Sequence, residues 1–505
     1  MSFQPNFFRK FEFKLIIILI LYVLTGIFLL KFFQYQINGD AIAYIKIAKT
    51  YFIGDWYGAV ESYHSPMISW LLIPFLLFSN KPTYALYATK ILSLFVGFFT
   101  IIGISLLSTR FDLNNKLRVV VLILLIPITL YFAYSAITPD LLLICFLVYY
   151  FYFIFDPDYQ NKLSSPLLCG ILGSMAYLTK SYAFPFTIAH FFIFNIFHYL
   201  KNKSNWKNVI RNLIMGFVVF FIISGLWMGV MSVKEGNFTY GSAGDFNHDL
   251  VGPGAKGWLT VYLGESPVDV QDWSAFESLA YFKYQLGLIW KNIQQTVSIF
   301  NTFSYFALII IISYVILIIK PVNKILKDQK VLFPLATLVI YVAGYTPILV
   351  EERYLWVAYI LLLLMGAYIL TLIFKNEFFT PTRKTILTLF FAVSFVILPV
   401  NYLVNNMNTD MEVYLLSESI NNLPEHSKIA SNNEWLKSSY LSYYWEGEYI
   451  GQSKPFSNQK ELINILKSHE TDYYLVWGDN NFNSSGYKEI TGGKIKGLVI
   501  YDMRS

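Results

Sequence analysis

The sequence has few charged residues and almost no cysteine. Only 14% of its 505 residues are charged, whereas soluble domains carry about 25%. The two cysteines, Cys145 and Cys169, lie inside apolar runs, which excludes a disulfide framework and a cysteine-based zinc site. The net charge of +6 comes from short basic clusters between apolar runs, so we expect no nucleic-acid partner. Hydrophobic residues (56%) and aromatic residues (19%) are abundant, which indicates a polytopic membrane protein.

The apolar residues are gathered into eleven runs near the length of roughly 20 residues that a membrane span needs. The predicted spans are 14–33, 84–108, 117–135, 138–155, 166–182, 184–200, 209–232, 299–320, 331–350, 353–375 and 384–404. The first is too long for a signal peptide and lacks a small-residue cleavage site, so we expect it to be retained. The run from Ser65 to Phe78 is shorter and contains Pro74, so it is either a twelfth span or a shallow, half-inserted helix.

The charges of the connecting loops decide between these two alternatives. If the run from Ser65 to Phe78 does not cross, all the basic clusters fall on one side of the membrane, which is then the cytoplasmic side. These clusters are Arg9/Lys10/Lys14, Arg110/Lys116/Arg118, Lys201/Lys203/Lys207/Arg211, Lys320/Lys324/Lys327/Lys330 and Lys375/Arg383/Lys384. We therefore predict eleven crossings of the plasma (inner) membrane, with the N-terminus in the cytoplasm and the C-terminus outside.

The expected fold class is a polytopic α-helical membrane protein with about eleven spans and a short shallow helix. Residues 1–404 form the transmembrane domain, with a juxtamembrane first external loop (34–65) and a long external loop (233–298). Within the long loop, residues 265–293 carry aromatics on one face, which predicts an amphipathic helix at the membrane interface. In residues 405–505, β-like runs such as DYYLVWG alternate with helical stretches such as NQKELINILKS, which predicts a small external (periplasmic) α/β domain.

Ionisable residues gather on the predicted external side. They are Asp40, Asp55, Glu61 and His64 in the first loop, Asp140 and Lys180 in two hairpins, and Glu351, Glu352 and Arg353 in a later hairpin. Ionisable groups at a membrane boundary are costly unless they are paired or solvated, although any one of them also suits a short polar hairpin. Their gathering on one face indicates a site that holds an anionic head group and also needs a base.

Several short motifs on this side follow one another in a defined order. They are GDAIAY (Asp40, Tyr44), Gly54-Asp55-Trp56, Ser65-Pro66-Met67-Ile68-Ser69-Trp70, Thr138-Pro139-Asp140, Leu178-Thr179-Lys180 and Glu352-Arg353-Tyr354-Leu355. With these motifs the chain resembles, over roughly residues 10–400, the membrane-embedded C-type glycosyltransferases that use polyprenyl-phosphate sugars. The branch that it resembles includes the protein O-mannosyltransferases and the bacterial aminoarabinose transferase of lipid A.

The resemblance implies both a fold and a reaction. The fold is a helical bundle whose first external loop forms juxtamembrane helices, often with an external C-terminal domain. The reaction moves a hexose or pentose from polyprenyl phosphate to an acceptor hydroxyl on the outer face, with inversion at the anomeric carbon. The expected partners are therefore a polyprenyl-phosphate-linked sugar, a lipid, protein or glycan acceptor, and the membrane lipids.

By the family's pattern, Asp40 is the catalytic base. An acceptor hydroxyl has a high pKa and needs a general base in line with the anomeric carbon, whereas the phosphate is already a workable leaving group. The alternative for Asp40 is a helix N-cap, since an aspartate followed by AIAYIKIAK starts a plausible helix.

The donor phosphate needs cations at membrane level. Arg353 is the first candidate, because a guanidinium matches phosphate oxygens with two parallel hydrogen bonds, and Lys180 is the second. For each the alternative is a snorkelling interfacial side chain, and the adjacent Glu351 and Glu352 are candidate partners for Arg353. In the aminoarabinose branch a lysine before the Pro-Pro-Leu helix start faces the phosphate, but here the aligned residue is His64 and the first proline is Ser65. His64 is thus a weaker phosphate contact, the phosphate sits differently, or His64 is an interfacial polar residue.

A further set of residues is expected to support the site or to contact substrate. This set is Tyr44, Asp55, Trp56, Glu61, Pro66, Asp140, Glu352 and Tyr354. No cofactor is implied with certainty. A divalent metal is compatible with the carboxylates and histidines outside the spans, but no spacing among them is diagnostic of a metal site.

Three other functions compete with this one. A polysaccharide polymerase or ligase also uses polyprenyl-linked sugars, but we expect arginine in its large external loop, and residues 233–298 contain none. A lipid-linked sugar flippase or transporter would place charges within its spans and is often built from internal repeats, which this sequence lacks. A sensor or structural protein would use its external domain to bind a partner. An enzyme requires that Asp40, Asp140, Lys180 and Arg353 converge on one external cavity.

Overall fold

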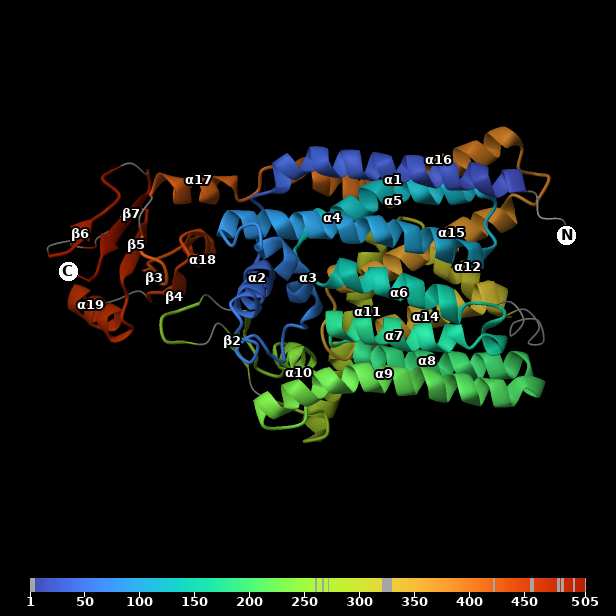
Figure 1. Cartoon of the computed structure of the whole chain (residues 1–505), viewed down its shortest axis with the longest axis horizontal. Coiled ribbons are helices and arrows are strands. Elements are labelled where there is room, and N and C mark those ends of the chain that lie inside the picture. The colour runs from blue at the N-terminus through green and yellow to red at the C-terminus, as the bar shows by residue number, and fades with distance from the viewer. Residues whose placement is uncertain are drawn as a thin grey trace.

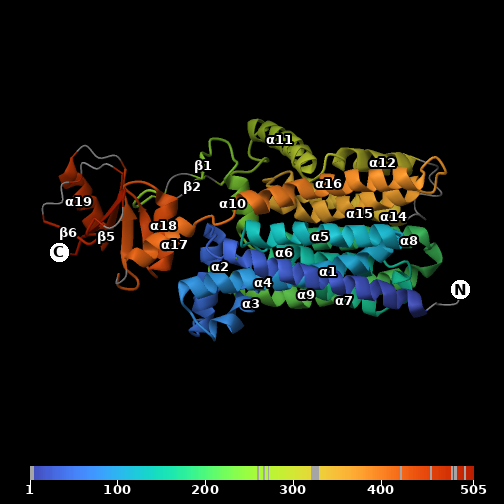
Figure 2. The same ribbon diagram turned by 90° about the horizontal axis from the view of Figure 1, so that it is seen from above.

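The computed structural model describes residues 5–258, 261–265, 268–270, 272–319, 329–420, 423–454, 458–478, 482, 486–493 and 496–504. A bundle of long helices occupies most of the molecule, and a small domain with a β-sheet lies at one end of it (Figure 1). The first helix begins at the opposite end of the bundle, as both side views show (Figure 2).

The bundle helices run side by side along the long axis (Figure 1). They are α1 (Pro5–Phe33), α4 (Pro82–Leu107), α5 (Asn115–Ser135), α6 (Asp140–Ile154), α7 (Ser164–Thr179), α8 (Ala183–Lys201), α9 (Trp206–Glu235), α12 (Ala307–Ile319), α14 (Gln329–Tyr345), α15 (Trp356–Ile373) and α16 (Pro381–Asn405). Helix α15 is buried over most of its length, because it is apolar on all sides and lies within the bundle.

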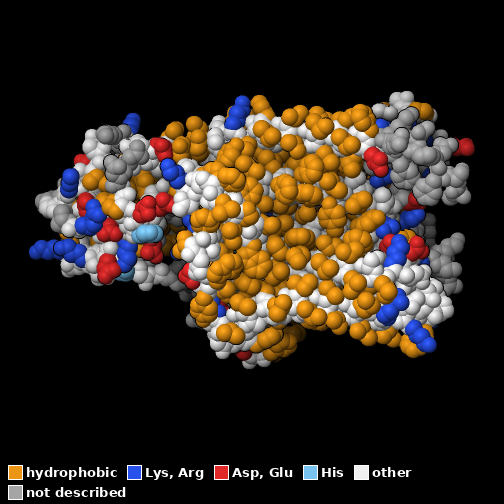
Figure 3. Space-filling view, in the orientation of Figure 1, with side chains coloured by type: hydrophobic (Ala, Val, Ile, Leu, Met, Phe, Trp, Pro, Cys, Tyr) orange, Lys and Arg blue, Asp and Glu red, His pale blue; other side chains and the backbone are white. Residues whose placement is uncertain are grey.

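The outer helices expose an apolar surface to their surroundings. Side chains such as Leu24 of α1, Leu226 of α9 and Phe390 of α16 are exposed, and hydrophobic residues cover the middle of the bundle while charged residues gather toward its ends (Figure 3). Among the described residues, seven helices are long and apolar enough to cross a membrane, or eight if the bent pair described below is one span. The chain is therefore an integral membrane protein, as predicted. Eleven crossings stay a prediction, because α6 and α14 are apolar but shorter than an ordinary span.

The basic loops share one end of the bundle. Lys330 forms an ion pair with Asp112 at 2.5 Å, and Lys201 donates to Gln329 at 2.8 Å, so three separate loops meet there. This end lies away from the sheet domain (Figure 1). The common location agrees with the predicted clustering of basic loops, and which side of a membrane it faces stays a prediction.

The first loop forms two juxtamembrane helices instead of a span. Helix α2 (Gly39–Phe52) packs against α3 (Met67–Leu76), and the Ser69 hydroxyl donates to the Tyr44 carbonyl at 2.9 Å. Helix α3 has only 10 residues and contains Pro74. It is far too short to cross a bilayer, so the shallow helix is confirmed.

The predicted span 299–320 is wrong in its boundaries. Helix α11 (Leu279–Phe303) continues from the predicted amphipathic region, and α12 follows it after a bend of 109°. The chain breaks at Ser304, which is extended and whose hydroxyl hydrogen-bonds with Ser394 at 2.7 Å. Helix α11 is also tied to the loop after α14, since Asn292 donates to the carbonyls of Thr346 and Ile348.

The C-terminal region folds into a small α/β unit, which begins after α16 ends at Asn405. Its sheet has the order β4-β3-β5-β7-β6, with β3 parallel to β4 and β5, and β7 antiparallel to β5. The strands are β3 (Lys428–Ser431), β4 (Glu448–Gln452), β5 (Tyr473–Trp477), β6 (Lys488–Glu489) and β7 (Leu498–Asp502), and the helices are α17 (Met411–Ser419), α18 (Trp435–Tyr444) and α19 (Gln459–Ser468). The unit rests on α2 through an ion pair between Lys49 and Glu446 at 2.7 Å.

The long loop is joined to this sheet. Besides α10 (Ala243–Asp249) and the short antiparallel pair β1 (Gly257–Trp258) and β2 (Val268–Asp269), it contains a segment beside edge strand β4. Leu263 N–H donates to the Gln452 carbonyl at 2.9 Å, and Gln452 N–H donates to the Val261 carbonyl at 2.6 Å. Gly451 has a φ of 128°, and a Cβ there would lie 2.8 Å from the Leu263 nitrogen, so only glycine suits this approach. We call this backbone pairing of 261–263 with Gln452 the clasp.

Candidate active site

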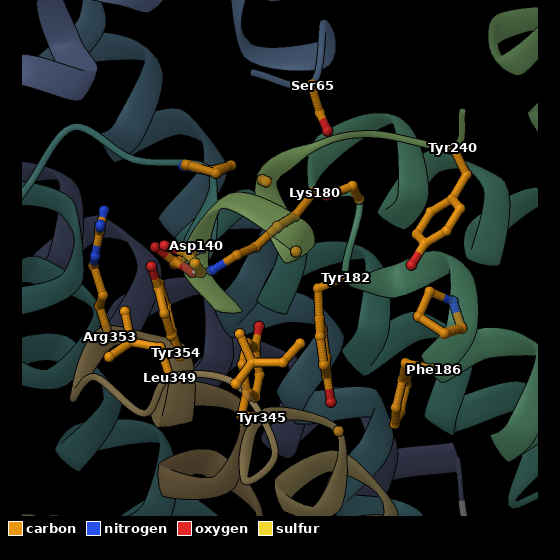
Figure 4. Close-up of a pocket in the computed structure, with 18 of the residues that line it drawn as sticks. Ser65, Asp140, Lys180, Tyr182, Phe186, Tyr240, Tyr345, Leu349, Arg353 and Tyr354 are labelled. Atoms are coloured by element: carbon orange, nitrogen blue, oxygen red, sulfur yellow. The ribbon is translucent and has the colours of Figure 1, made fainter. Parts of the chain in front are cut away.

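A cavity of about 620 Å³ opens at the end of the bundle that carries the sheet domain. Its polar part is lined by Asp40, His64, Asp140, Lys180 and Arg353. Its apolar part continues between α8 and α14, where Pro185, Phe186, Ala189, Val339 and Ala343 line it. Figure 4 shows Lys180 reaching toward Asp140, with Tyr182 and Phe186 farther along the cavity. The cavity is therefore polar at one end and apolar at the other.

Asp40 lies in the first turn of α2. Asn38 occupies the N-cap position, so Asp40 does not cap the helix as the alternative required. Arg353 Nη1 donates to Asp40 Oδ2 at 2.6 Å, while Oδ1 faces His64 Nε2 at 3.9 Å. One carboxylate oxygen is thus held by a cation, and the other faces the cavity wall that His64 forms.

Arg353 begins a short 3₁₀ turn, η4 (Arg353–Leu355), that leads into α15. Its Nε donates to Glu351 Oε2 at 2.9 Å, in addition to the Nη1 bond to Asp40. Among the described residues, no hydrogen-bond partner is recorded for Nη2. Because a guanidinium has five donors in a rigid fork, Arg353 retains the capacity to bind an anion while it holds both carboxylates.

Lys180 and Asp140 form a second ion pair in the cavity wall. Asp140 begins α6 and Lys180 follows α7, and their Nζ–Oδ1 distance is 2.6 Å. The Asp140 side chain is only 2% exposed, and Lys180 Nζ also lies 3.8 Å from the Tyr354 ring centroid. Asp40, Asp140, Lys180 and Arg353 thus converge on one cavity, as the enzyme hypothesis requires.

His64 lies beside Asp40 and is oriented by Glu61. Its backbone N–H donates to Glu61 Oε1 at 3.1 Å, and the same oxygen pairs with ring nitrogen Nδ1. The rings of Tyr44 and Tyr63 meet the imidazole edge-on. Burial raises the pKa of Tyr63 to about 12, and the Asp40 carboxylate adds to the rise, so this phenol remains a hydrogen-bond donor at neutral pH.

Not every predicted residue reaches the cavity. Tyr44 and Tyr354 line it, but in the part of the chain that the structure describes the lining omits Asp55, Trp56, Glu61, Pro66 and Glu352. Asp55 accepts the Gly58 N–H at 2.7 Å, and Trp56 is 65% exposed, so both shape the surface of the first loop. Glu352 accepts a hydrogen bond from the Tyr131 hydroxyl, and Pro66 precedes α3 at its N-cap.

No family model and no curated protein matches the sequence. Similar folds occur among solved structures. ArnT from Cupriavidus metallidurans bound to undecaprenyl phosphate superposes with a TM-score of 0.57 at 12% identity, over 96% of this chain and 98% of that chain. The archaeal oligosaccharyltransferase AglB from Archaeoglobus fulgidus, in complex with an inhibitory peptide and a dolichol-phosphate, gives a TM-score of 0.55 at 13% identity, over 92% and 69%. The chain has the C-type glycosyltransferase fold. The fold implied by the short motifs is therefore confirmed.

This C-type fold also bears on the metal question. A second AglB structure, with a TM-score of 0.56 at 12% identity over 91% of this chain and 68% of that chain, is a complex with Zn and sulfate. In the described part of this chain, no group of three or more His, Cys, Asp and Glu side chains could hold a metal ion. The two carboxylates in the cavity already have Arg353 and Lys180 as partners.

Sequence patterns alone do not identify several residues that close the cavity. They are Tyr63, Ser65, Ser181, Tyr182, Tyr240, Asn247 and Tyr345. Tyr240 and Asn247 come from the long loop, whose α10 reaches the cavity because Ser242 N–H donates to the Ser62 carbonyl at 2.8 Å. That contact joins positions far apart in the chain, and neither hydropathy nor motif spacing encodes it. Tyr63, Ser65 and Ser181 had a signal, since they flank His64 and Lys180.

Proposed function

We propose that this protein is an inverting glycosyltransferase that moves a sugar from a polyprenyl-phosphate donor to an acceptor hydroxyl on the outer face of the membrane. One observation carries the proposal: two cations and two carboxylates, Lys180, Arg353, Asp40 and Asp140, line the polar end of a cavity whose other end is apolar. A lipid phosphate is divided in the same way, into an anionic head group and an apolar chain. The fold shared with ArnT bound to undecaprenyl phosphate and with AglB bound to a dolichol-phosphate supports the assignment.

The donor lies with its isoprenoid chain between α8 and α14 and its phosphate beside Arg353. The guanidinium is the first phosphate contact, since Nη2 has no recorded partner among the described residues and charge-assisted bonds to phosphate are strong. Lys180 is the second contact, because an ammonium has three donors and only one of them is used by Asp140. The sugar then occupies the polar end of the cavity, near Asp40.

Asp40 is the general base of this reaction. Its Oδ1 takes the proton of the acceptor hydroxyl while the acceptor oxygen forms a bond to the anomeric carbon. The bond between the anomeric carbon and the phosphate oxygen breaks, and its electron pair stays on the phosphate, which needs no proton to leave. Arg353 contacts Asp40 Oδ2 at 2.6 Å. It therefore fixes the base relative to the phosphate that it also binds.

The competing functions receive less support from the cavity. A flippase or transporter would be expected to carry its charges within the spans. Lys90 of α4 is one such buried charge, but in the described part of the chain the cavity lining does not include it. A polymerase or ligase acting on lipid-linked sugars differs in its donor rather than in its fold, so the choice of donor distinguishes it.

The test uses the full-length protein in lipid nanodiscs with a panel of undecaprenyl-phosphate-linked hexoses and pentoses. We expect release of undecaprenyl phosphate together with a glycosylated acceptor, in an extract of the lipids, proteins and glycans of the cell envelope. Asp40→Asn should abolish transfer and keep undecaprenyl phosphate binding. Asp55→Asn is the matched control, because Asp55 is a first-loop aspartate outside the cavity lining. Transfer by the Asp40→Asn variant would remove Asp40 from the mechanism, and transfer only from diphosphate-linked oligosaccharides would favour the polymerase or ligase.

A further inference from the structure

The residue at position 64 departs from the family pattern, and its surroundings suggest why. Where the related branch has a lysine facing the phosphate, this chain has a histidine whose recorded polar partners, in the described part of the chain, are Glu61 and Asp40. The two cations assigned to the phosphate are paired with Asp140 and Asp40 instead. His64 therefore lies on the side of the base.

Glu61 selects the form of the imidazole. A carboxylate accepts hydrogen bonds, so its contact with Nδ1 favours the tautomer that carries the proton on Nδ1. Nε2 then has a free lone pair, and it is this nitrogen that faces Asp40 Oδ1. Glu61 is held in this position by a second bond, because the backbone N–H of His64 donates to the same carboxylate oxygen at 3.1 Å.

The separation of the two groups suits an intervening water molecule. At 3.9 Å, Nε2 and Oδ1 are too far apart for a direct hydrogen bond, yet one water between them has two O–H groups and can donate to both acceptors. Both side chains are partly open to the cavity, with 17% exposure for His64 and 28% for Asp40. The acceptor hydroxyl would then reach Asp40 Oδ1 from the cavity.

Several other ionisable groups surround His64 and Asp40 and interact with them electrostatically. They are Tyr44 and Asp40 from α2, Tyr63 and Glu61 from the first loop, Arg353 and Glu351 beside Asp40, and Asp140 behind them. Asp40 is already paired with Arg353, whereas the imidazole faces carboxylates on both sides. An imidazolium formed on His64 would therefore have a carboxylate on each side.

We propose that His64, oriented by Glu61, is the terminal proton acceptor of the transfer reaction, a role that rests on the function proposed above. The acceptor hydroxyl gives its proton to Asp40 Oδ1 as its oxygen bonds to the anomeric carbon and the bond from that carbon to the phosphate oxygen breaks. A water molecule between Oδ1 and Nε2 then takes the proton from Oδ1 and gives one of its own to Nε2, which restores the Asp40 carboxylate. The resulting imidazolium keeps its Nδ1 proton on Glu61 and later loses the extra proton to water. His64 is a catalytic residue in this scheme, and Glu61 is a positioning residue.

The first experiment separates this role from phosphate binding. We expect His64→Gln to lower the transfer rate about 100-fold, within the range known for general acid–base groups, and to leave the affinity for undecaprenyl phosphate unchanged. We expect His64→Lys to be equally slow, because a charged lysine takes no further proton. Recovery of wild-type transfer in His64→Lys, or loss of undecaprenyl phosphate binding in His64→Gln, would show that His64 is a phosphate contact and would overturn the proposal.

The second experiment uses the tautomer of His64. Nitrogen NMR of the histidine-labelled protein should show an Nδ1-protonated His64 in the wild type and not in Glu61→Gln. His426→Asn is the matched control, since His426 is an exposed histidine of the sheet domain with a φ of 63°, which asparagine tolerates.

The outcomes distinguish the two proposals. A wild-type protein that transfers no sugar from any undecaprenyl-phosphate donor overturns the proposed function, and the role of His64 falls with it. A wild-type protein that transfers sugar while Glu61→Gln keeps the same His64 tautomer overturns the role of His64 alone.

Discussion

Two carboxylate–cation pairs face the same cavity, and they differ in how they are held. The pair of Asp40 and Arg353 is partly open, with 28% exposure of each side chain, and Arg353 has a further carboxylate partner in Glu351. The pair of Asp140 and Lys180 is closed into the wall, with 2% and 16% exposure. An open pair can exchange partners when an anion arrives, whereas a closed pair cannot do so cheaply. We infer that Arg353 changes partners when the donor binds, whereas Lys180 stays paired with Asp140 in the wall and contacts the phosphate only with its remaining donors.

The largest expected effect comes from breaking the closed pair. Lys180→Met leaves the Asp140 carboxylate buried and uncompensated, and Asp140 Oδ2 already has no hydrogen-bond partner among the described residues. Loss of one partner of a buried pair costs about 3–5 kcal/mol of folding free energy. Thermal unfolding in detergent should show a clear drop in stability, and the double variant Lys180→Met with Asp140→Asn should recover much of it.

Lys49→Met is the control for that experiment. Lys49 pairs with Glu446 at 2.7 Å, but the two side chains are 27% and 32% exposed. Loss of a solvent-exposed pair should cost at most about 1 kcal/mol. Equal destabilisation by Lys49→Met and Lys180→Met would contradict the distinction between a closed and an open pair.

The second-largest expected effect is a loss of transfer activity when the open pair of Asp40 and Arg353 is altered. Arg353→Lys keeps the positive charge but loses the rigid fork that joins Asp40, Glu351 and the phosphate. Loss of one charge-assisted hydrogen bond corresponds to about 10- to 100-fold in transfer rate, with little change in thermal stability. A variant that unfolds as readily as Lys180→Met would show that Arg353 is also part of the fixed wall.

The smallest effect tests the exchange of partners directly. Glu351 is 41% exposed and competes with the donor phosphate for Arg353. Glu351→Gln should therefore strengthen undecaprenyl phosphate binding by about two- to fivefold, which matches the worth of an exposed ion pair. Weaker binding in this variant would mean that Glu351 orients Arg353 for the phosphate rather than competing with it.

The sequence predicts the composition of this cavity better than its connections. Span length and loop charge placed Asp40, Asp140, Lys180 and Arg353 on one face, because helices of similar length that alternate in direction return their hairpins to the same two ends. Which cation pairs with which carboxylate depends on how far each hairpin extends from the helix ends. A hydropathy profile does not contain this information. For this reason the sequence offered only Glu351 and Glu352 as partners for Arg353 and none for Lys180, whereas Arg353 also pairs with Asp40 and Lys180 pairs with Asp140.

The remaining misses have a similar cause. At the break between α11 and α12, Ser304 hydrogen-bonds with Ser394, and Asn292 within α11 donates to a carbonyl of another loop. The hydropathy of residues 299–320 does not indicate either contact. The orientation of His64 is set by Glu61 three residues earlier, a spacing that is visible in the sequence but equally suits an ordinary polar turn. Local patterns specify elements, and long-range contacts decide how they meet.

The clasp has a consequence for the energetics of substrate capture. By fixing 261–263 to Gln452, it divides one long loop into two shorter ones, and a shorter loop has fewer conformations to lose when a ligand orders it. The segment that reaches the cavity, α10, is therefore restrained before any donor arrives. A free loop would lose conformational entropy when the donor binds, and this loss would weaken donor affinity. Here part of that entropy is already lost when the sheet domain folds and pairs with the loop. We therefore expect a domain whose described residues do not line the cavity to influence how tightly the cavity binds.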